Sequence, residues 1–137
     1  MPKKPRATKV TKGRTPASLV WFEIPADSID RAKTFYGSLF GWTFNKLPAA
    51  IANYWHIDTG GGNGTPDGGL MPRLHPAQSI TNYIAVPSVT KAATKVRKLG
   101  GTICKPKTGV PGMGYFVICE DPEGNTFALW EMNPRAK

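Results

Sequence analysis

The sequence contains one pattern twice, 60 positions apart. Residues 28–41 run from a serine through a basic residue, small residues and a leucine to a glycine, and residues 88–101 follow the same order. Ile24 before the first copy is matched by Ile84 before the second. A repeat of this length indicates two copies of one supersecondary unit that bury their apolar faces together. We therefore expect one domain of two halves, with function in the groove between them.

The size and apolar content of the chain are typical of a soluble domain. A chain of 137 residues is long enough to bury its own core. No apolar run approaches the roughly 18 residues that a membrane span needs, and no signal peptide is evident. The two cysteines, Cys104 and Cys119, are expected to be free thiols in a reducing compartment. We therefore expect a cytoplasmic protein without a membrane partner.

The positive charge is concentrated at the start of the chain. The formal net charge is +9, and the first 14 positions hold six of the 18 basic residues and no acidic residue. Such a Pro-, Thr- and Lys-rich stretch cannot bury enough apolar surface to order itself, which predicts a disordered basic tail over residues 1–16. The tail either solubilises the chain or touches a polyanion. Because no aromatic residues are interleaved with its charges, we do not expect nucleic acid as a partner.

The hydrophobic periodicity predicts an α+β domain over residues 17–137, made of two tandem βαβββ modules. Module 1 covers about 18–73, a linker covers 74–80, and module 2 covers about 81–133. The expected helices are capped by Ser28 and Ser88. Strands are predicted at 18–24, 42–46, 52–59 and 67–72, and then at 81–86, 102–105, 115–120 and 125–132.

Three segments carry a resemblance to a known family. They are residues 22–27, residues 35–42 with the run Phe-Tyr followed by Leu-Phe-Gly-Trp, and the turn Asp-Pro-Glu-Gly-Asn at 121–125. Together with the repeat, they resemble the vicinal oxygen chelate superfamily, which includes glyoxalase I, bleomycin-resistance proteins and extradiol dioxygenases. The resemblance implies a curved mixed sheet around a cleft, with the helices on its outer face. It does not imply one reaction, since members isomerise, cleave rings, transfer thiols or sequester drugs.

Metal-dependent members of this superfamily hold a divalent ion with His, Glu or Gln side chains on the first and last strands of each half. The positions of this sequence that match are Trp21, Thr81, Gly68 or Gly69, and Ala128. None of these side chains is an imidazole, a carboxylate or a thiolate, the usual donors to such ions. We therefore expect no metal and no other cofactor, unless Glu23 or Glu131 takes a ligand position.

Strand alternation predicts what lines the cleft instead. If Trp21 faces the cleft, then Glu23 does too, while Phe22 and Ile24 face the helix. The residues expected to bind a ligand are Trp21, Tyr54, Tyr83 and Trp130, with Met113 and Tyr115 at the mouth. Aromatic walls with a few polar groups are typical of a site for an organic molecule.

Glu23 and His56 are the candidate catalytic residues. As a pair, they would form a general base without a metal; alternatively they hydrogen-bond a ligand, or are structural. The favoured hypothesis is a metal-free protein that binds a small organic metabolite. The alternative is a lyase, isomerase or dioxygenase-type enzyme that uses Glu23 and His56 as an acid–base pair or as metal ligands. The resemblance also implies a homodimer that covers aromatic surface such as Phe40 and Trp42.

Overall fold

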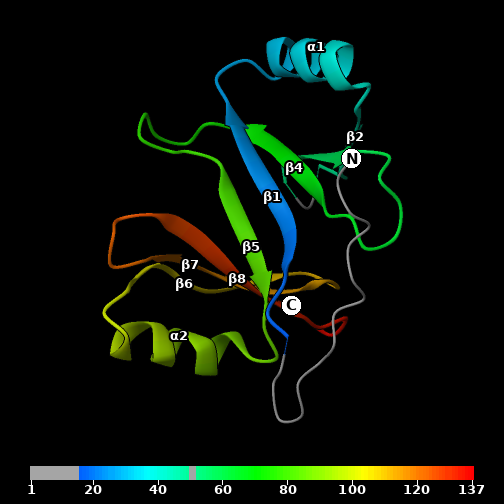
Figure 1. The fold of residues 1–137 in the computed structure, drawn as a ribbon. Coiled ribbons are helices and arrows are strands. Elements are labelled where there is room, and N and C mark those ends of the chain that lie inside the picture. Colours follow the sequence, from blue (N-terminus) through cyan, green and yellow to red (C-terminus); the bar gives the residue numbers. More distant parts are fainter. Residues whose placement is uncertain (1–15, 50–51) are drawn as a thin grey trace, which may run out of the picture.

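The computed structural model describes residues 16–49 and 52–137, so the predicted basic tail falls almost wholly outside the described residues. The helices and strands follow one another in the order predicted for two βαβββ modules (Figure 1). In module 1 they are β1 Leu19–Ala26, α1 Ile29–Phe40, β2 Thr43–Lys46, β3 Trp55–Asp58 and β4 Asp67–Pro72. In module 2 they are β5 Thr81–Ala85, α2 Val89–Lys98, β6 Thr102–Val110, β7 Gly114–Glu120 and β8 Thr126–Met132.

The strands of the described residues form a single eight-stranded mixed sheet in the order β2-β3-β4-β1-β5-β8-β7-β6. The modules meet where β1 pairs with β5 in antiparallel fashion. That pairing is symmetric about Phe22 and Asn82, which are themselves 60 positions apart. The α+β class and the two-module architecture expected from the repeat are therefore confirmed.

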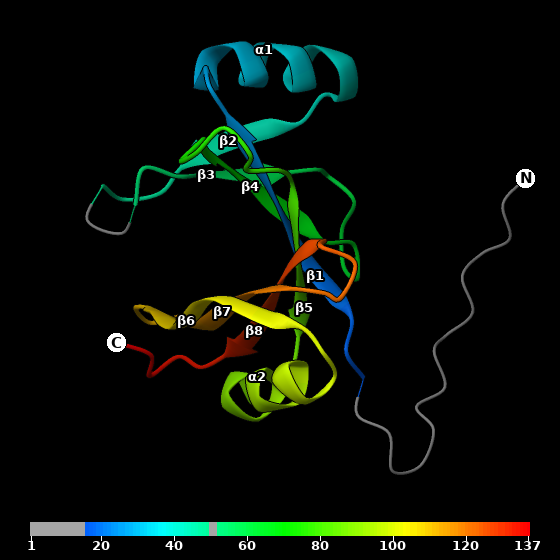
Figure 2. The same ribbon diagram turned by 90° about the vertical axis from the view of Figure 1, so that its left-hand side faces the viewer.

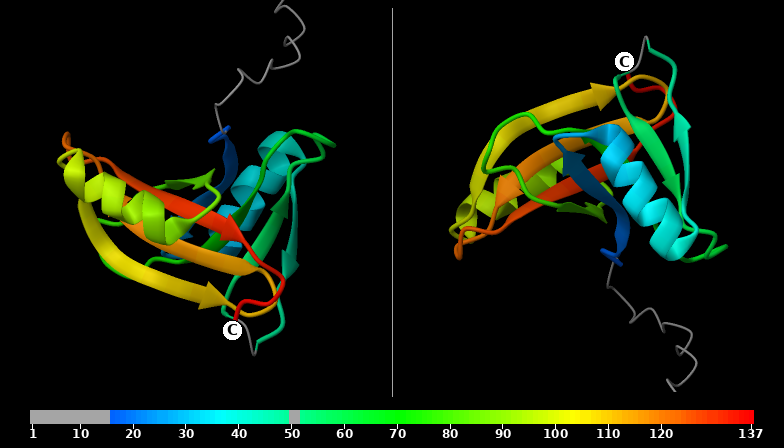
Figure 3. Two further views of the ribbon diagram at one scale, coloured as in Figure 1. Left: turned by 90° about the horizontal axis from the view of Figure 1, so that it is seen from below. Right: turned by 90° about the horizontal axis from the view of Figure 1, so that it is seen from above.

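Each module has its own apolar core beneath its own helix. In module 1, Ile24, Ile57 and Leu70 are buried, and α1 packs on them through partly buried residues. In module 2, Val89 of α2 is buried against Val117 of β7 and its neighbours. The two helices lie at opposite ends of the molecule (Figures 1 and 2), and the strands under α2 are long and curved (Figure 3).

Both helices begin as the repeated serines predict. The hydroxyl oxygens of Ser28 and Ser88 each accept a hydrogen bond, at 3.1 Å, from the backbone N–H three residues later. Helix α1 ends at Gly41, whose φ of 73° is a left-handed conformation that glycine adopts without strain. None of the helices in the described ranges is both long and apolar enough to span a membrane.

The largest differences from the sequence-based expectation are in two strands. The strand predicted over 52–59 is formed only by β3, so Tyr54 lies just before it. The strand predicted over 102–105 extends to Val110, and its pairing with β7 continues through two irregularities, between Ile103 and Lys105 and between Lys105 and Thr108. Such a β-bulge redirects the side chains on either side of it.

Candidate functional site

The carboxylate of Glu23 lies at the centre of a hydrogen-bonded aromatic cluster on the face of the sheet away from the helices. The Tyr54 hydroxyl donates to its Oε2 at 2.9 Å. The Tyr83 hydroxyl lies 3.2 Å from both carboxylate oxygens. The indole N–H of Trp21 donates to the Tyr54 hydroxyl oxygen at 2.9 Å. Four of the predicted site residues are thus brought together at the seam between the modules.

A glycine makes room for this cluster. Gly69 of β4 pairs with Glu23 on one side and with His56 on the other. A Cβ atom at Gly69 would lie 1.7 Å from the Tyr54 hydroxyl oxygen, so any larger side chain would collide with the tyrosine. The hydroxyl of Tyr54 therefore occupies the space above Gly69, between Glu23 and His56.

The structure does not pair His56 with Glu23. Because β4 lies between β3 and β1, the two residues are two strands apart, which is about 9–10 Å at the backbone. Instead, Nε2 of His56 lies 3.0 Å from Oδ2 of Asp67, and the imidazole stacks on the Trp21 indole with centroids 5.5 Å apart. Asp67, which we did not predict as a site residue, is therefore the acidic partner of His56.

Burial controls the protonation of the cluster. It raises the pKa of Glu23, an effect opposed by the hydrogen bonds from Tyr54 and Tyr83 and by the charge of Lys105. Burial also raises the pKa of both tyrosines, and the Glu23 charge adds to that rise. Both hydroxyls are therefore protonated at neutral pH and act as donors to Glu23.

The pKa of the Asp67 carboxyl is shifted in the opposite direction from that of Glu23. A hydrogen bond from the backbone N–H of Thr59, followed by smaller contributions from His56, lowers the pKa of the Asp67 carboxyl. Its Oδ1 accepts from both the N–H and the hydroxyl of Thr59 at 3.1 Å. Asp67 is therefore ionised at neutral pH and fixes the orientation of the His56 ring.

Phe116 is an aromatic residue that was not predicted for the site, and it lies on the same face of the sheet as the Glu23 cluster, which we call the cleft face. Its ring lies 6.3 Å from that of Tyr83, and its backbone pairs with Trp130 of β8. Tyr115, predicted at the cleft mouth, lies instead on the opposite face, where it packs against the core under α2. Met113 is half-exposed in the turn before β7.

Glu131, considered above as a replacement ligand, faces α2. Its Oε1 accepts a hydrogen bond of 2.9 Å from the backbone N–H of Val89 at the start of that helix. Neither the cleft positions matched to the family ligands nor Glu131 therefore supplies a donor set for a divalent ion. Within residues 16–49 and 52–137, no group of three His, Cys, Asp or Glu side chains is arranged to hold a metal ion.

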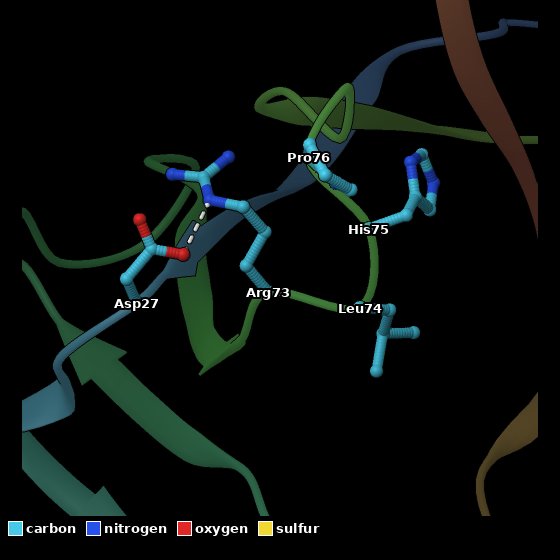
Figure 4. Close-up of a pocket in the computed structure, with 5 residues that line it drawn as sticks. All are labelled: Asp27, Arg73, Leu74, His75 and Pro76. Carbon is cyan, nitrogen blue, oxygen red and sulfur yellow. Dashed lines mark hydrogen bonds and ion pairs between the residues drawn. The ribbon is translucent and has the colours of Figure 1, made fainter.

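A separate hollow of about 700 Å³ lies beside the linker between the modules (Figure 4). Its charged groups are bound to one another: the Arg73 Nε donates to Asp27 at 3.1 Å, and other guanidinium nitrogens donate to the carbonyls of Pro25 and Gln78. Leu74, His75 and Pro76 complete its lining. Arg73 thus anchors the linker, and the hollow lies apart from the Glu23 cluster.

Two βαβββ modules that share one sheet define a protein of the vicinal oxygen chelate fold. A glyoxalase/bleomycin resistance protein/dioxygenase superfamily member from Vibrio splendidus has the same fold, with a TM-score of 0.61 and 12% sequence identity over 86% of this chain and all of that one. Residues 18–60 match the family model described as bleomycin resistance protein-like N-terminal. The chain is also 32% identical to a glyoxylase-like domain-containing protein of Didymella fabae, over 78% of this chain and 88% of that protein. It therefore belongs to the glyoxalase/bleomycin-resistance family of the vicinal oxygen chelate superfamily.

Another relative is considerably longer. The chain is 27% identical to the anthracycline biosynthesis protein DnrV of Streptomyces peucetius, over 84% of this chain but 47% of that protein. The chain spans about half the length of the bacterial curated relatives it matches, 45% to 47%.

Proposed function

We propose that this protein binds a small, partly aromatic organic molecule in the cleft, with Glu23 as the polar anchor and without a metal ion. The observation that supports this proposal is the Glu23 carboxylate, withdrawn from water and framed by Trp21, Tyr54 and Tyr83. Removing a carboxylate from water is costly unless its hydrogen bonds are replaced. A purely structural role does not require a carboxylate withdrawn from water at the seam between the two modules.

The cluster leaves acceptor capacity for a ligand. An ionised carboxylate has about four acceptor positions. Tyr54 donates to Oε2, while the hydroxyl of Tyr83 is shared between both oxygens, so Oε1 is the less occupied atom. A ligand hydroxyl or N–H group is the natural donor to Oε1, and the neighbouring aromatic rings suit a flat apolar body.

The test uses N-phenyl-1-naphthylamine, a neutral fluorescent probe with two aromatic groups and one N–H donor. We expect it to bind the wild-type chain, and Glu23→Gln to weaken that binding roughly tenfold, because a hydrogen bond to a charged group contributes about 1.5–3 kcal/mol. Glu123→Gln is the matched control, since Glu123 is an exposed carboxylate in the turn between β7 and β8. Loss of binding in the Glu123 variant but not in the Glu23 variant would contradict the proposal.

The pairing of His56 with Asp67 favours a second candidate, an acid–base enzyme such as a lyase or isomerase on the same scaffold. A carboxylate that holds one ring nitrogen fixes the tautomer and leaves the other nitrogen free to exchange a proton with a substrate. Incubation with a metabolite extract, followed by mass spectrometry, tests this function. Turnover that His56→Ala abolishes would favour the enzyme over the simple binding protein.

We further propose that a second copy of the chain covers helix α1. Phe35, Leu39 and Phe40 are 58%, 58% and 55% exposed there, which is a large apolar area for a free surface. Native mass spectrometry reports the oligomeric state directly. A monomer at micromolar concentration, unchanged by Phe40→Ser, would contradict this assembly.

A further inference from the structure

A bulge in β6 sends two neighbouring lysines to opposite faces of the sheet. Lys105 pairs with Ile118, and Thr108 pairs with Phe116, so three steps along β6 match two along β7. The ammonium of Lys105 lies 5.5 Å from the centre of the Phe116 ring, on the cleft face. The insertion removes the usual alternation, by which residues two apart share a face.

Lys107 therefore lies on the helix side. Its ammonium lies 4.5 Å from the centre of the Tyr115 ring and 3.4 Å from the hydroxyl oxygen of Thr90 in α2. The two lysines have the same charge and similar aromatic supports, but only Lys105 belongs to the cleft.

Lys105 ends a row of residues that crosses the cleft from the Glu23 cluster. Successive backbone partners in this row are Trp21, Tyr83, Ala128, Ile118 and Lys105. Cross-strand partners project from the same face of a sheet. Ala128 is fully buried in this row, so the partly exposed Ile118, flanked by Phe116, forms the apolar surface that separates the acidic end of the cleft from a basic end.

The ammonium of Lys105 has no acidic partner of its own. Among the described residues, Arg73 forms an ion pair with Asp27 and Asp67 lies beside His56, so no carboxylate pairs with Lys105. Its charge nevertheless acts on Glu23 across the cleft. Lys105 thus offers an unused positive charge beside an aromatic surface.

We propose that the cleft selects an aromatic organic acid, whose anionic group binds Lys105 while its rings lie over Phe116 and Ile118. This inference rests on the proposed function and adds the charge of the ligand and the orientation in which it lies in the cleft. The anionic end must lie at β6, because the opposite orientation would place it beside the Glu23 carboxylate. A carboxylate, a sulfonate or a phosphate satisfies the same contact.

The test compares two probes that share one ring system. 8-Anilinonaphthalene-1-sulfonate is an anion, and N-phenyl-1-naphthylamine is its neutral counterpart without the sulfonate. Lys105→Met keeps an apolar stem over Phe116 and removes the charge. We expect it to weaken the binding of the anionic probe roughly fivefold, as for a pair of partly exposed charges, and to change that of the neutral probe by less than twofold.

Lys107→Met is the matched control and is expected to change neither affinity. Raising the salt concentration should weaken the binding of the anionic probe to the wild-type chain and have little effect on its binding to Lys105→Met. An equal loss for both probes in Lys105→Met, or an equal loss of the anionic probe in both lysine variants, would overturn the inference. If Glu23→Gln weakens the neutral probe while Lys105→Met changes nothing, the proposed function stands and the charge selection fails. If neither probe binds, both fail.

Discussion

Replacing Gly69 with alanine tests whether the Tyr54 ring lies directly over Gly69. The added Cβ would lie 1.7 Å from the tyrosine oxygen, 2.0 Å from Cζ and 2.2 Å from Cε1. These distances are far below van der Waals contact, so the ring has to leave. The hydrogen bond from Tyr54 to Glu23 is lost with it, and so is the bond from Trp21.

The expected cost follows from these losses. A hydrogen bond to a charged group contributes about 1.5–3 kcal/mol, and the displaced ring also loses packing. We expect Gly69→Ala to lower the free energy of unfolding by about 3 kcal/mol, or Tm by roughly 10 °C for a domain of this size. Urea and thermal denaturation measure both quantities. Gly37→Ala is the control: the nearest atom to its added Cβ is 3.4 Å away, and alanine favours a helix, so we expect no loss of stability.

A double-mutant cycle refutes or supports the reasoning. In a Tyr54→Ala background the collision no longer exists, so the additional effect of Gly69→Ala should fall below about 1 kcal/mol. If Gly69→Ala costs the same in both backgrounds, Tyr54 does not lie over Gly69.

Three further predictions address single groups. Burial raises the folded-state pKa of Glu23 above its ordinary value of 4.5. The stability of the wild type relative to Glu23→Gln should therefore be greatest below pH 4.5 and decline as the pH rises through the folded-state pKa. Urea denaturation across pH 4–8 measures this stability difference, and a difference that rises with pH would contradict the prediction. Glu131→Gln should cost about 1 kcal/mol, because the charged partner of the Val89 N–H at the start of α2 is lost, and an unchanged Tm would argue against that role. Cys104 is exposed, whereas Cys119 is buried with its pKa raised to about 11, so Ellman's reagent should titrate one thiol quickly in the native protein and the second only after denaturation. Two equally fast thiols would contradict this assignment.

The sequence predicted the fold well because its signals are local or repeated. The serine caps, the terminal glycine and the 60-residue offset each depend on neighbouring residues or on the second copy. Alternation along β1 also assigned Trp21 and Glu23 to one face and Phe22 and Ile24 to the core face, once the match of Trp21 to a family ligand position had set the phase.

The details of the site depend on contacts between strands, which the sequence does not encode locally. His56 meets Asp67 rather than Glu23 because of the order of β3, β4 and β1 in the sheet. Along β7 both faces are apolar, so the pattern could not distinguish Tyr115 from Phe116 as the cleft residue. The bulge that turns Lys105 inward leaves no signature beyond Pro106 within the strand.

The anchoring of the linker by Arg73 bears on which chain supplies each half of the sheet. The modules meet through β1 and β5, a pairing that one chain can make with itself or two chains can make reciprocally. A short linker keeps the two modules of one chain at a high effective concentration relative to each other. The contacts of Arg73 with Asp27 and with the carbonyls of Pro25 and Gln78 hold this linker folded back against module 1. One guanidinium group at the end of β4 thus favours assembly within a chain over exchange between chains.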